Sequence, residues 1–363
     1  MFVRHAHYRR TKRNHIYACD EDTRDIMYDT LASLCACDGV SGHEESVRNR
    51  ILSLGSFDAH HVDPLGNLLC FKGDGDAPPS VVLDAHMDEV GFLVRHIDKD
   101  GFITLDALGG IDPRVLEGAQ LTVHGREPLR AVVGDLPPHL SKEEKAPKLQ
   151  DLPVDTGLSG KEVRDLVPVG SPVCFWSPLR RLGSSYVSGK ALDNRAGCAV
   201  LCSVSHSLPK ECNALFLFSV QEEVGVRGAT TALFGKEDAP ALCIDATHAG
   251  MPGVDERLTR PLGSGPVIGM GPAVDPGLHA RLVHLAGSLG IPHTVKAYPG
   301  RMPTNLRALQ VTGKGMRGAL ASLPARYLHT PCEVMDLRDL DACTRLAGAY
   351  VESWCESTGG AAV

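Results

Sequence analysis

The sequence predicts an α/β protein in which a mixed sheet, covered by helices on both faces, is interrupted by a small β-rich domain. Apolar runs of strand length alternate with longer amphipathic segments, a rhythm typical of a sheet that is buried on both faces. Between residues 91 and 177 the texture changes to short half-apolar segments separated by Gly, Asp and Pro. The 363-residue chain also exceeds what one small core usually holds, which favours a second domain.

The individual elements follow from local patterns. The opening segment has five Arg or Lys before residue 16 and no acid, so we expect residues 1–22 to be a loose tail. A first helix is expected from Met27. Buried strands are expected at residues 67–71, 80–85, 214–220 and 241–245. Further helices are expected at 195–207, 277–289 and 336–354.

These elements form one interrupted domain and one insert. The larger α/β domain is expected to comprise residues 23–90 and 178–363, and the β-rich insert residues 91–177. The polypeptide therefore leaves the larger domain after one buried strand and returns to it before the next helix.

Composition excludes several classes of protein. The chain is 43% hydrophobic and 22% charged with a net charge of -7, which is typical of a globular protein and gives no reason to expect a nucleic-acid partner. No apolar run approaches the roughly 18 residues of a membrane span, and the start lacks the apolar region of a secretory signal. We therefore expect a cytoplasmic protein with no membrane partner, whose twelve cysteines are reduced thiols.

Ionisable side chains gather directly after the predicted strands. Open α/β sheets form their sites beyond the carboxyl ends of the strands, so we expect these side chains to meet. The stretches are LDAHMDE, ALDNR, SVQEEVG and CIDATHAG, with LPARYLHTPCE near the end of the chain. The candidate site residues are His86, Asp88, Asp193, Glu222, Glu223, Asp245 and His329.

Imidazoles together with several carboxylates suit a borderline divalent cation such as Zn²⁺, Co²⁺ or Mn²⁺. The carboxylates exceed the needs of one ion, which indicates two ions about 3.5–4 Å apart. The His-x-Asp spacing lets Asp88 orient the imidazole of His86. Adjacent Glu222 and Glu223 repel each other unless a cation faces them, so Glu223 can bind metal while Glu222 takes a proton from the water between the ions.

The chain resembles the tetrahedral aminopeptidases, a family of two-metal peptidases that includes glutamyl and deblocking aminopeptidases. The similarity runs from about Leu31 to Trp354. It is carried by VSGHEESVR, DPLGNLL, AHMDEVGFLV, LGGIDPRVLEG, PPHL, ALDNRAGCAV, QEEVGVRGA, IDATHAG and LPARYLHTPCEV. Related carboxypeptidases and deacylases leave only a short gap between their first His and the bridging Asp, whereas here the small domain lies between His86 and Asp193.

The resemblance implies a role for each candidate residue. His86 and Asp245 would bind one ion, Glu223 and His329 the other, and Asp193 would bridge both, with Glu222 as general base. The bond after Asp193 would be a cis peptide. The expected activity is removal of N-terminal residues from short peptides by the water that bridges the metals.

The resemblance also implies an assembly. The larger domain would be catalytic, and the inserted domain would form dimers that assemble into hollow twelve-subunit tetrahedra. These shells would admit short peptides and exclude folded proteins.

Two positions depart from the family pattern. Asn194 stands where a second acid usually follows the bridging Asp, a side chain that is not expected to bind metal. Pro303, Thr304 and Asn305 stand where the family typically has Gly-Thr-Asp, in a loop that borders the substrate pocket. The second departure leaves substrate preference open.

Two other functions are weighed against this one. The glutamate pair could serve a glycoside hydrolase, but those enzymes need carboxyl groups about 5–9.5 Å apart across a sugar, which adjacent glutamates among histidines fit poorly. The altered loop could belong to a silent assembly or peptide-binding protein, although every expected metal position is retained. A chelator and a broad aminoacyl panel would distinguish the three.

Overall fold

The larger domain is built on an eight-stranded mixed sheet. The computed structural model describes residues 21–135, 147–300 and 302–355. The strand order is β1-β2-β12-β3-β13-β16-β14-β15, and β12, β3, β13 and β16 are mutually parallel at its centre. The strands are β1 (Ala59–Val62), β2 (Leu68–Lys72), β3 (Val81–His86), β12 (Ala214–Ser219), β13 (Ala241–His248), β14 (Val267–Met270), β15 (Thr294–Ala297) and β16 (Gly318–Ala325).

Helices cover both faces of this sheet, as predicted. Alternate residues of β12 separate the two faces, because Phe216 and Phe218 pack in one hydrophobic cluster while Leu215 and Leu217 pack in the other. The first face is covered by α1 (Glu21–Cys35), α2 (Glu45–Leu54), α4 (Leu192–Ser207), α6 (Pro276–Ser288) and α8 (Leu337–Cys355). The second is covered by α5 (Arg227–Ala232) and α7 (Leu306–Leu309).

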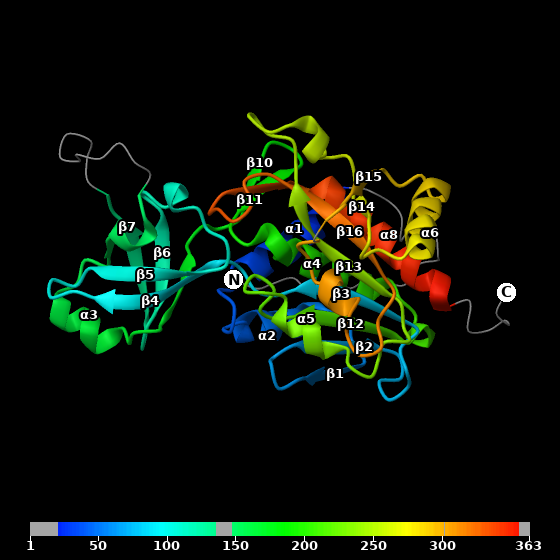
Figure 1. Cartoon of the computed structure of the whole chain (residues 1–363), viewed down its shortest axis with the longest axis horizontal. Coiled ribbons are helices and arrows are strands. Elements are labelled where there is room, and N and C mark those ends of the chain that lie inside the picture. Colours follow the sequence, from blue (N-terminus) through cyan, green and yellow to red (C-terminus); the bar gives the residue numbers. More distant parts are fainter. Residues whose placement is uncertain (1–20, 136–146, 301, 356–363) are drawn as a thin grey trace.

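The β-rich segment forms a separate closed barrel that projects to one side of the larger domain (Figure 1). The barrel has its own core, in which Phe92 and Phe175 pack edge to face. Its strands are β4 (Gly91–Ile97), β5 (Ile103–Leu108), β6 (Gln120–His124), β7 (Pro128–Val133), β8 (Val154–Asp155) and β9 (Pro172–Phe175), with α3 (Gly160–Leu166) beside them. The order around the barrel is β4-β5-β8-β7-β6-β9.

A small antiparallel sheet completes the fold. It contains β10 (Arg180–Leu182), β11 (Tyr186–Gly189) and β17 (Glu333–Asp336). Because β17 follows β16 closely in the chain, this sheet holds the segment that carries His329 beside the large sheet. No helix among residues 21–135, 147–300 and 302–355 has the length and apolar character needed to cross a membrane.

Most predicted elements are confirmed, but two details differ. The first helix begins at Glu21, before Met27. Residues 21 and 22 of the expected tail, residues 1–22, therefore belong to this helix, and the rest of the tail lies outside the described residues. β13 continues beyond Asp245 to His248 because it pairs with β16 along its whole length, whereas its pairing with β3 ends at Cys243.

The prediction that all cysteines are reduced is wrong for one pair. A disulfide joins Cys212 to Cys355, whose Cα atoms are 4.8 Å apart. The two residues are distant in sequence, and only the packing of α8 against the segment before β12 brings them together. The other cysteines of the described segments are free thiols, and most are buried.

Candidate metal centre

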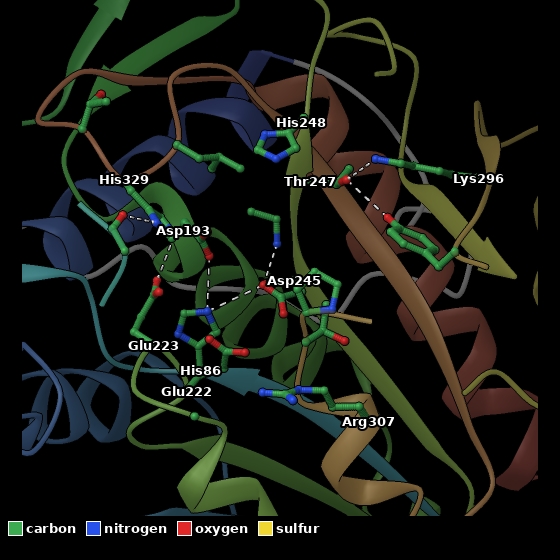
Figure 2. Close-up of a pocket in the computed structure, with 18 of the residues that line it drawn as sticks. His86, Asp193, Glu222, Glu223, Asp245, Thr247, His248, Lys296, Arg307 and His329 are labelled. Carbon is green, nitrogen blue, oxygen red and sulfur yellow. Dashed lines mark hydrogen bonds and ion pairs between the residues drawn. The ribbon is translucent and has the colours of Figure 1, made fainter. Parts of the chain in front are cut away.

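The fold gathers the predicted site residues at one end of the central strands (Figure 2). His86 ends β3, Asp193 lies in the first turn of α4, and Glu222 and Glu223 follow β12. Asp245 lies within β13, and His329 lies between β16 and β17. Six of the seven predicted residues line one cavity of about 660 Å³; the seventh, Asp88, is fully buried behind it.

The two imidazoles are held in the same manner. His86 Nδ1 is 3.1 Å from the main-chain oxygen of Asp88, and His329 Nδ1 is 2.8 Å from that of Gly110. A carbonyl oxygen only accepts hydrogen bonds, so both rings carry a proton on Nδ1. Each Nε2 is therefore directed toward the carboxylates and available to a cation.

The side chains form two groups that share Asp193. His86 Nε2 lies 3.2 Å from Asp193 Oδ1 and 3.6 Å from Asp245 Oδ1. His329 Nε2 lies 3.3 Å from Glu223 Oε1 and 3.6 Å from Asp193 Oδ2. The ligand atoms within each group are all within 4.8 Å of one another, and His86 forms a further such group with Glu222 and Glu223. This mixture of nitrogen and oxygen donors fits divalent cations.

The pKa values of the site residues also favour a bound divalent cation. Burial opposes protonation of the imidazoles, yet hydrogen bonds to Asp193 and Glu223 raise the pKa of His329 to about 12. The pKa of His86 is likewise raised well above its usual range, against burial, by Asp193, Asp245 and Asp88. Burial raises the pKa of Glu222 to about 9, with His86 opposing and the neighbouring carboxylates adding to the shift. The protein alone thus retains protons that a divalent cation would displace.

Asp88 has a different principal contact from the predicted one. Its carboxylate is 3.5 Å from His86 Nδ1, farther than its own main-chain oxygen. Asp88 Oδ1 accepts the backbone N–H of Glu222 at 2.9 Å, and Oδ2 accepts that of Glu223 at 3.2 Å. Ser41 Oγ donates to Oδ2 at 2.6 Å. The Asp88 carboxylate therefore holds the backbone of the glutamate pair, while its carbonyl orients His86.

Sequence reasoning missed Glu333. Its side chain is only 2% exposed, and its two oxygens accept the backbone N–H groups of His329 at 2.7 Å and of Asp193 at 3.0 Å. The residue stands inside the LPARYLHTPCE stretch, but nothing in its spacing distinguishes it from a surface acid. Gly110, in the segment after β5, was missed because it contributes a main-chain oxygen, a group that every residue carries.

The structure accounts for both departures from the family pattern. Asn194 points away from the cluster, where its amide donates to the main-chain oxygen of Ile244 at 2.8 Å. The predicted cis peptide between Asp193 and Asn194 is confirmed. The Asn305 amide donates to both oxygens of buried Asp84, at 3.2 and 3.0 Å. An acid at position 305 would instead face the Asp84 carboxylate.

Lys296 and Arg307 add positive charge to the lining of the cavity. Lys296 Nζ donates to Thr247 Oγ1 at 3.1 Å and lies 5.2 Å from the ring centre of Tyr298. Arg307 also lines the cavity, and its buried Nε has no partner among the described residues. Among the described residues, no carboxylate forms an ion pair with Lys296 or with Arg307. Burial, and then Arg260, lower the pKa of Lys296.

A fourth group of metal-binding side chains lies away from this cavity. Asp38, His124 and Cys174 meet where the barrel joins the larger domain. The ammonium group of Lys190 already pairs with Asp38 at 2.8 Å, and His124 contacts the other oxygen of Asp38 at 2.9 Å. The Lys190–Asp38 ion pair therefore lies within the larger domain, and the His124–Asp38 contact joins the barrel to it.

Known proteins resemble the chain over most of its length. A lysyl aminopeptidase from Pyrococcus furiosus is 31% identical over 339 residues, covering 90% of this chain and 97% of that protein. The structure of an aminopeptidase from Desulfurococcus kamchatkensis matches with 30% identity and a TM-score of 0.85, covering 94% of this chain and 99% of that one. The Pyrococcus horikoshii TET1 peptidase, described as assembling into a tetrahedron or an octahedral shell, matches with 30% identity and a TM-score of 0.79, covering 89% and 98%.

One similar structure is described differently. A Thermotoga maritima protein described as an endoglucanase is 30% identical with a TM-score of 0.72, covering 89% of this chain and 99% of its own. The family model described as M42 glutamyl aminopeptidase matches residues 66–346, which include every predicted site residue. The chain therefore belongs to the M42 glutamyl aminopeptidase family.

Proposed function

We propose that this metal-dependent aminopeptidase uses two divalent cations and prefers peptides that begin with an acidic residue. The observation that carries the first part is the pair of ligand groups around Asp193, one completed by His86 and Asp245 and the other by Glu223 and His329. The ions are Zn²⁺ or Co²⁺, with Mn²⁺ as a third candidate, because imidazole and carboxylate donors suit all three.

The side chains of the site have different roles in peptide hydrolysis. When bound, the two ions supply Lewis-acid chemistry, polarising a peptide carbonyl and acidifying a water molecule. Glu222 lies beside His86 (Figure 2). Once its own proton has been displaced by bound cations, its carboxylate would accept the proton of the attacking water and return it to the leaving amine. Asp88 fixes the backbone of Glu222 and so the direction of this base.

The acidic preference follows from the two cationic side chains that line the cavity. Lys296 and Arg307 face the space that a substrate side chain would enter, and neither is neutralised by a carboxylate of the described residues. A glutamate or aspartate side chain would supply the missing charge, whereas a lysine side chain would be repelled.

The test is a metal-dependent activity panel. The protein is stripped with a chelator, reloaded separately with Zn²⁺, Co²⁺ or Mn²⁺, and assayed on Glu-, Asp-, Leu- and Lys-p-nitroanilide. We expect activity only after reloading, at two ions per chain, and with the acidic substrates fastest. Saturation at one ion would contradict the two-metal centre, and equal rates on Glu and Lys would contradict the acidic pocket.

The same panel decides between the alternatives. Hydrolysis of a soluble β-glucan that persists in chelator would support the glycoside hydrolase, and inertness of metal-loaded protein on every aminoacyl substrate would support the silent relative. The clustered histidines favour neither, because a glycosidase has no need of two imidazoles directed at shared carboxylates.

We also propose that the barrel, taken as residues 91–177, forms dimers that assemble into a twelve-subunit shell. Val132 and Trp176 are 49% and 41% exposed on the barrel, and Arg130 stacks on Trp176 at 4.6 Å. Large exposed apolar side chains of this kind mark association surfaces. Light scattering should give about 470 kDa, twelve times the chain mass of 38.8 kDa, and Trp176→Glu should reduce it. A monomeric wild-type protein would overturn this proposal.

A further inference from the structure

Two buried carboxylates hold the backbone of the metal centre. Each accepts hydrogen bonds from the backbone N–H groups of two site residues. Asp88 accepts the N–H groups of Glu222 and Glu223, and Glu333 accepts those of Asp193 and His329. Among the described residues, neither Asp88 nor Glu333 belongs to a group of side chains that could hold an ion.

Glu333 lies at the base of the segment that carries His329. Arg326 and Val334 exchange two backbone hydrogen bonds, at 2.9 and 3.1 Å, which close residues 327–333 into a loop. Glu333 stands immediately inside this closure and reaches across the loop to the N–H of His329 with one oxygen. Its other oxygen reaches the N–H of Asp193 on a different element, the start of α4.

The loop needs such a restraint. Tyr327 and His329 have φ values of 58° and 62°, in the left-handed region that residues other than glycine seldom adopt. A residue in this region persists where surrounding contacts enforce it. The carboxylate of Glu333 enforces the turn at His329, and the main-chain oxygen of Gly110 enforces the ring orientation.

From this geometry we infer that Glu333 is a positioning residue of the metal centre, which fixes the separation between Asp193 and His329 through their backbone N–H groups. The inference rests on the proposed two-metal function. Partners of this kind, one contact away from the metal, change metal affinity by about 10–100-fold when they are altered. Glu333→Gln preserves the volume but presents a donor to one of the two N–H groups, so it breaks one arm of the restraint.

The chain offers a matched control. Asp339 is also fully buried, and its two oxygens accept the backbone N–H groups of Gly263 at 2.8 Å and Gly265 at 2.6 Å. None of these residues lines the cavity of the metal centre. Asp339→Asn therefore breaks the same kind of restraint at a place where only folding can suffer.

The experiment compares Zn²⁺ and Co²⁺ binding to chelator-stripped wild-type protein, Glu333→Gln and Asp339→Asn by calorimetry, with the visible absorption of bound Co²⁺ as a second readout. We expect Glu333→Gln to weaken at least one of the two ions about 10–100-fold and to change the Co²⁺ spectrum. Asp339→Asn should lower the melting temperature yet bind both ions as the wild type does.

The outcomes separate this inference from the proposed function. Wild-type protein that binds no metal would overturn the two-metal proposal itself. Wild-type protein that binds two ions, with Glu333→Gln within twofold of it at both, would overturn the role of Glu333 alone. If Glu333→Gln does not fold, Glu333→Asp keeps the charge but shortens the reach by one methylene, and its affinities decide by the same criterion.

Discussion

The two sides of the central cavity differ in charge and in how firmly their side chains are held. On one side, carboxylates crowd around His86 and His329, and backbone contacts to Asp88 and Glu333 fix the residues that carry them. On the other side, Lys296 is held by one hydrogen bond to Thr247 and a contact with the ring of Tyr298. The side with the metal ligands is fixed by many contacts, which hold the groups that carry out the reaction in one geometry. The side with Lys296 can change with few structural consequences. Substrate preference can therefore diverge while the reaction is kept.

The largest effect is expected on the metal side, at the base. Glu222→Gln should lower turnover by about 10²–10⁴-fold because the amide cannot accept the proton of the attacking water. Metal content should stay at the wild-type value, since Glu223 rather than Glu222 is the proposed ligand. The variant is tested by kinetics together with elemental analysis of bound metal. Loss of metal from this variant would mean that the roles of the two glutamates are reversed.

The opposite side of the cavity should respond in specificity rather than in turnover. Lys296→Met should reduce kcat/KM on Glu-p-nitroanilide by about 10–100-fold, the range of a hydrogen bond to a charged group, and leave Leu-p-nitroanilide nearly unchanged. Lys161→Met, on the exposed surface of α3, is the matched control and should change neither. A parallel loss on both substrates would show that Lys296 supports the fold and not the choice of substrate.

Protons should compete with metal ions for His329. In the metal-free protein His329 stays protonated well above neutrality, because Asp193 and Glu223 raise its pKa to about 12. A cation must displace that proton, so Zn²⁺ affinity should rise with pH, by about tenfold per pH unit for each proton released. Calorimetry in buffers of different ionisation enthalpy counts these protons. An affinity that is constant between about pH 6 and 8 would contradict a protonated imidazole in the empty site.

A smaller effect should come from restoring the acid typical of the family at position 305. Asn305→Asp should destabilise the protein by at least about 2 kcal/mol, because it replaces a donor to buried Asp84 by a second carboxylate. The double variant with Asp84→Asn should recover most of this loss, as urea unfolding would show. Equal stability of the single variant and the wild type would refute the pairing of these two residues.

The smallest effect is expected at the start of the chain. Deleting residues 1–20 should leave activity and melting temperature nearly unchanged, because this segment lacks apolar periodicity and precedes α1. A fall in melting temperature of more than about 4 °C, roughly 1 kcal/mol for a domain of moderate size, would show that the segment contributes to the fold.

The sequence by itself determined the parts of the protein that depend on local pattern. Continuous apolar runs predicted the central strands within a few residues, and the side chains that follow them predicted which residues would meet. The end of β13 was misplaced because polar residues from Asp245 onward look like a loop, yet pairing with β16 keeps them extended.

Only the tertiary structure decided the contacts that hold the site. Glu333 accepts the backbone N–H groups of two site residues, Gly110 offers its carbonyl oxygen to His329, and the Ser41 hydroxyl donates to Asp88. No spacing in the sequence marks these contacts, because their partners are distant segments or main-chain groups. The pairing of Asn305 with Asp84 and the disulfide of Cys212 likewise join distant segments. Apolar periodicity is a property of neighbouring residues, whereas these contacts depend on which distant elements the packed core brings together.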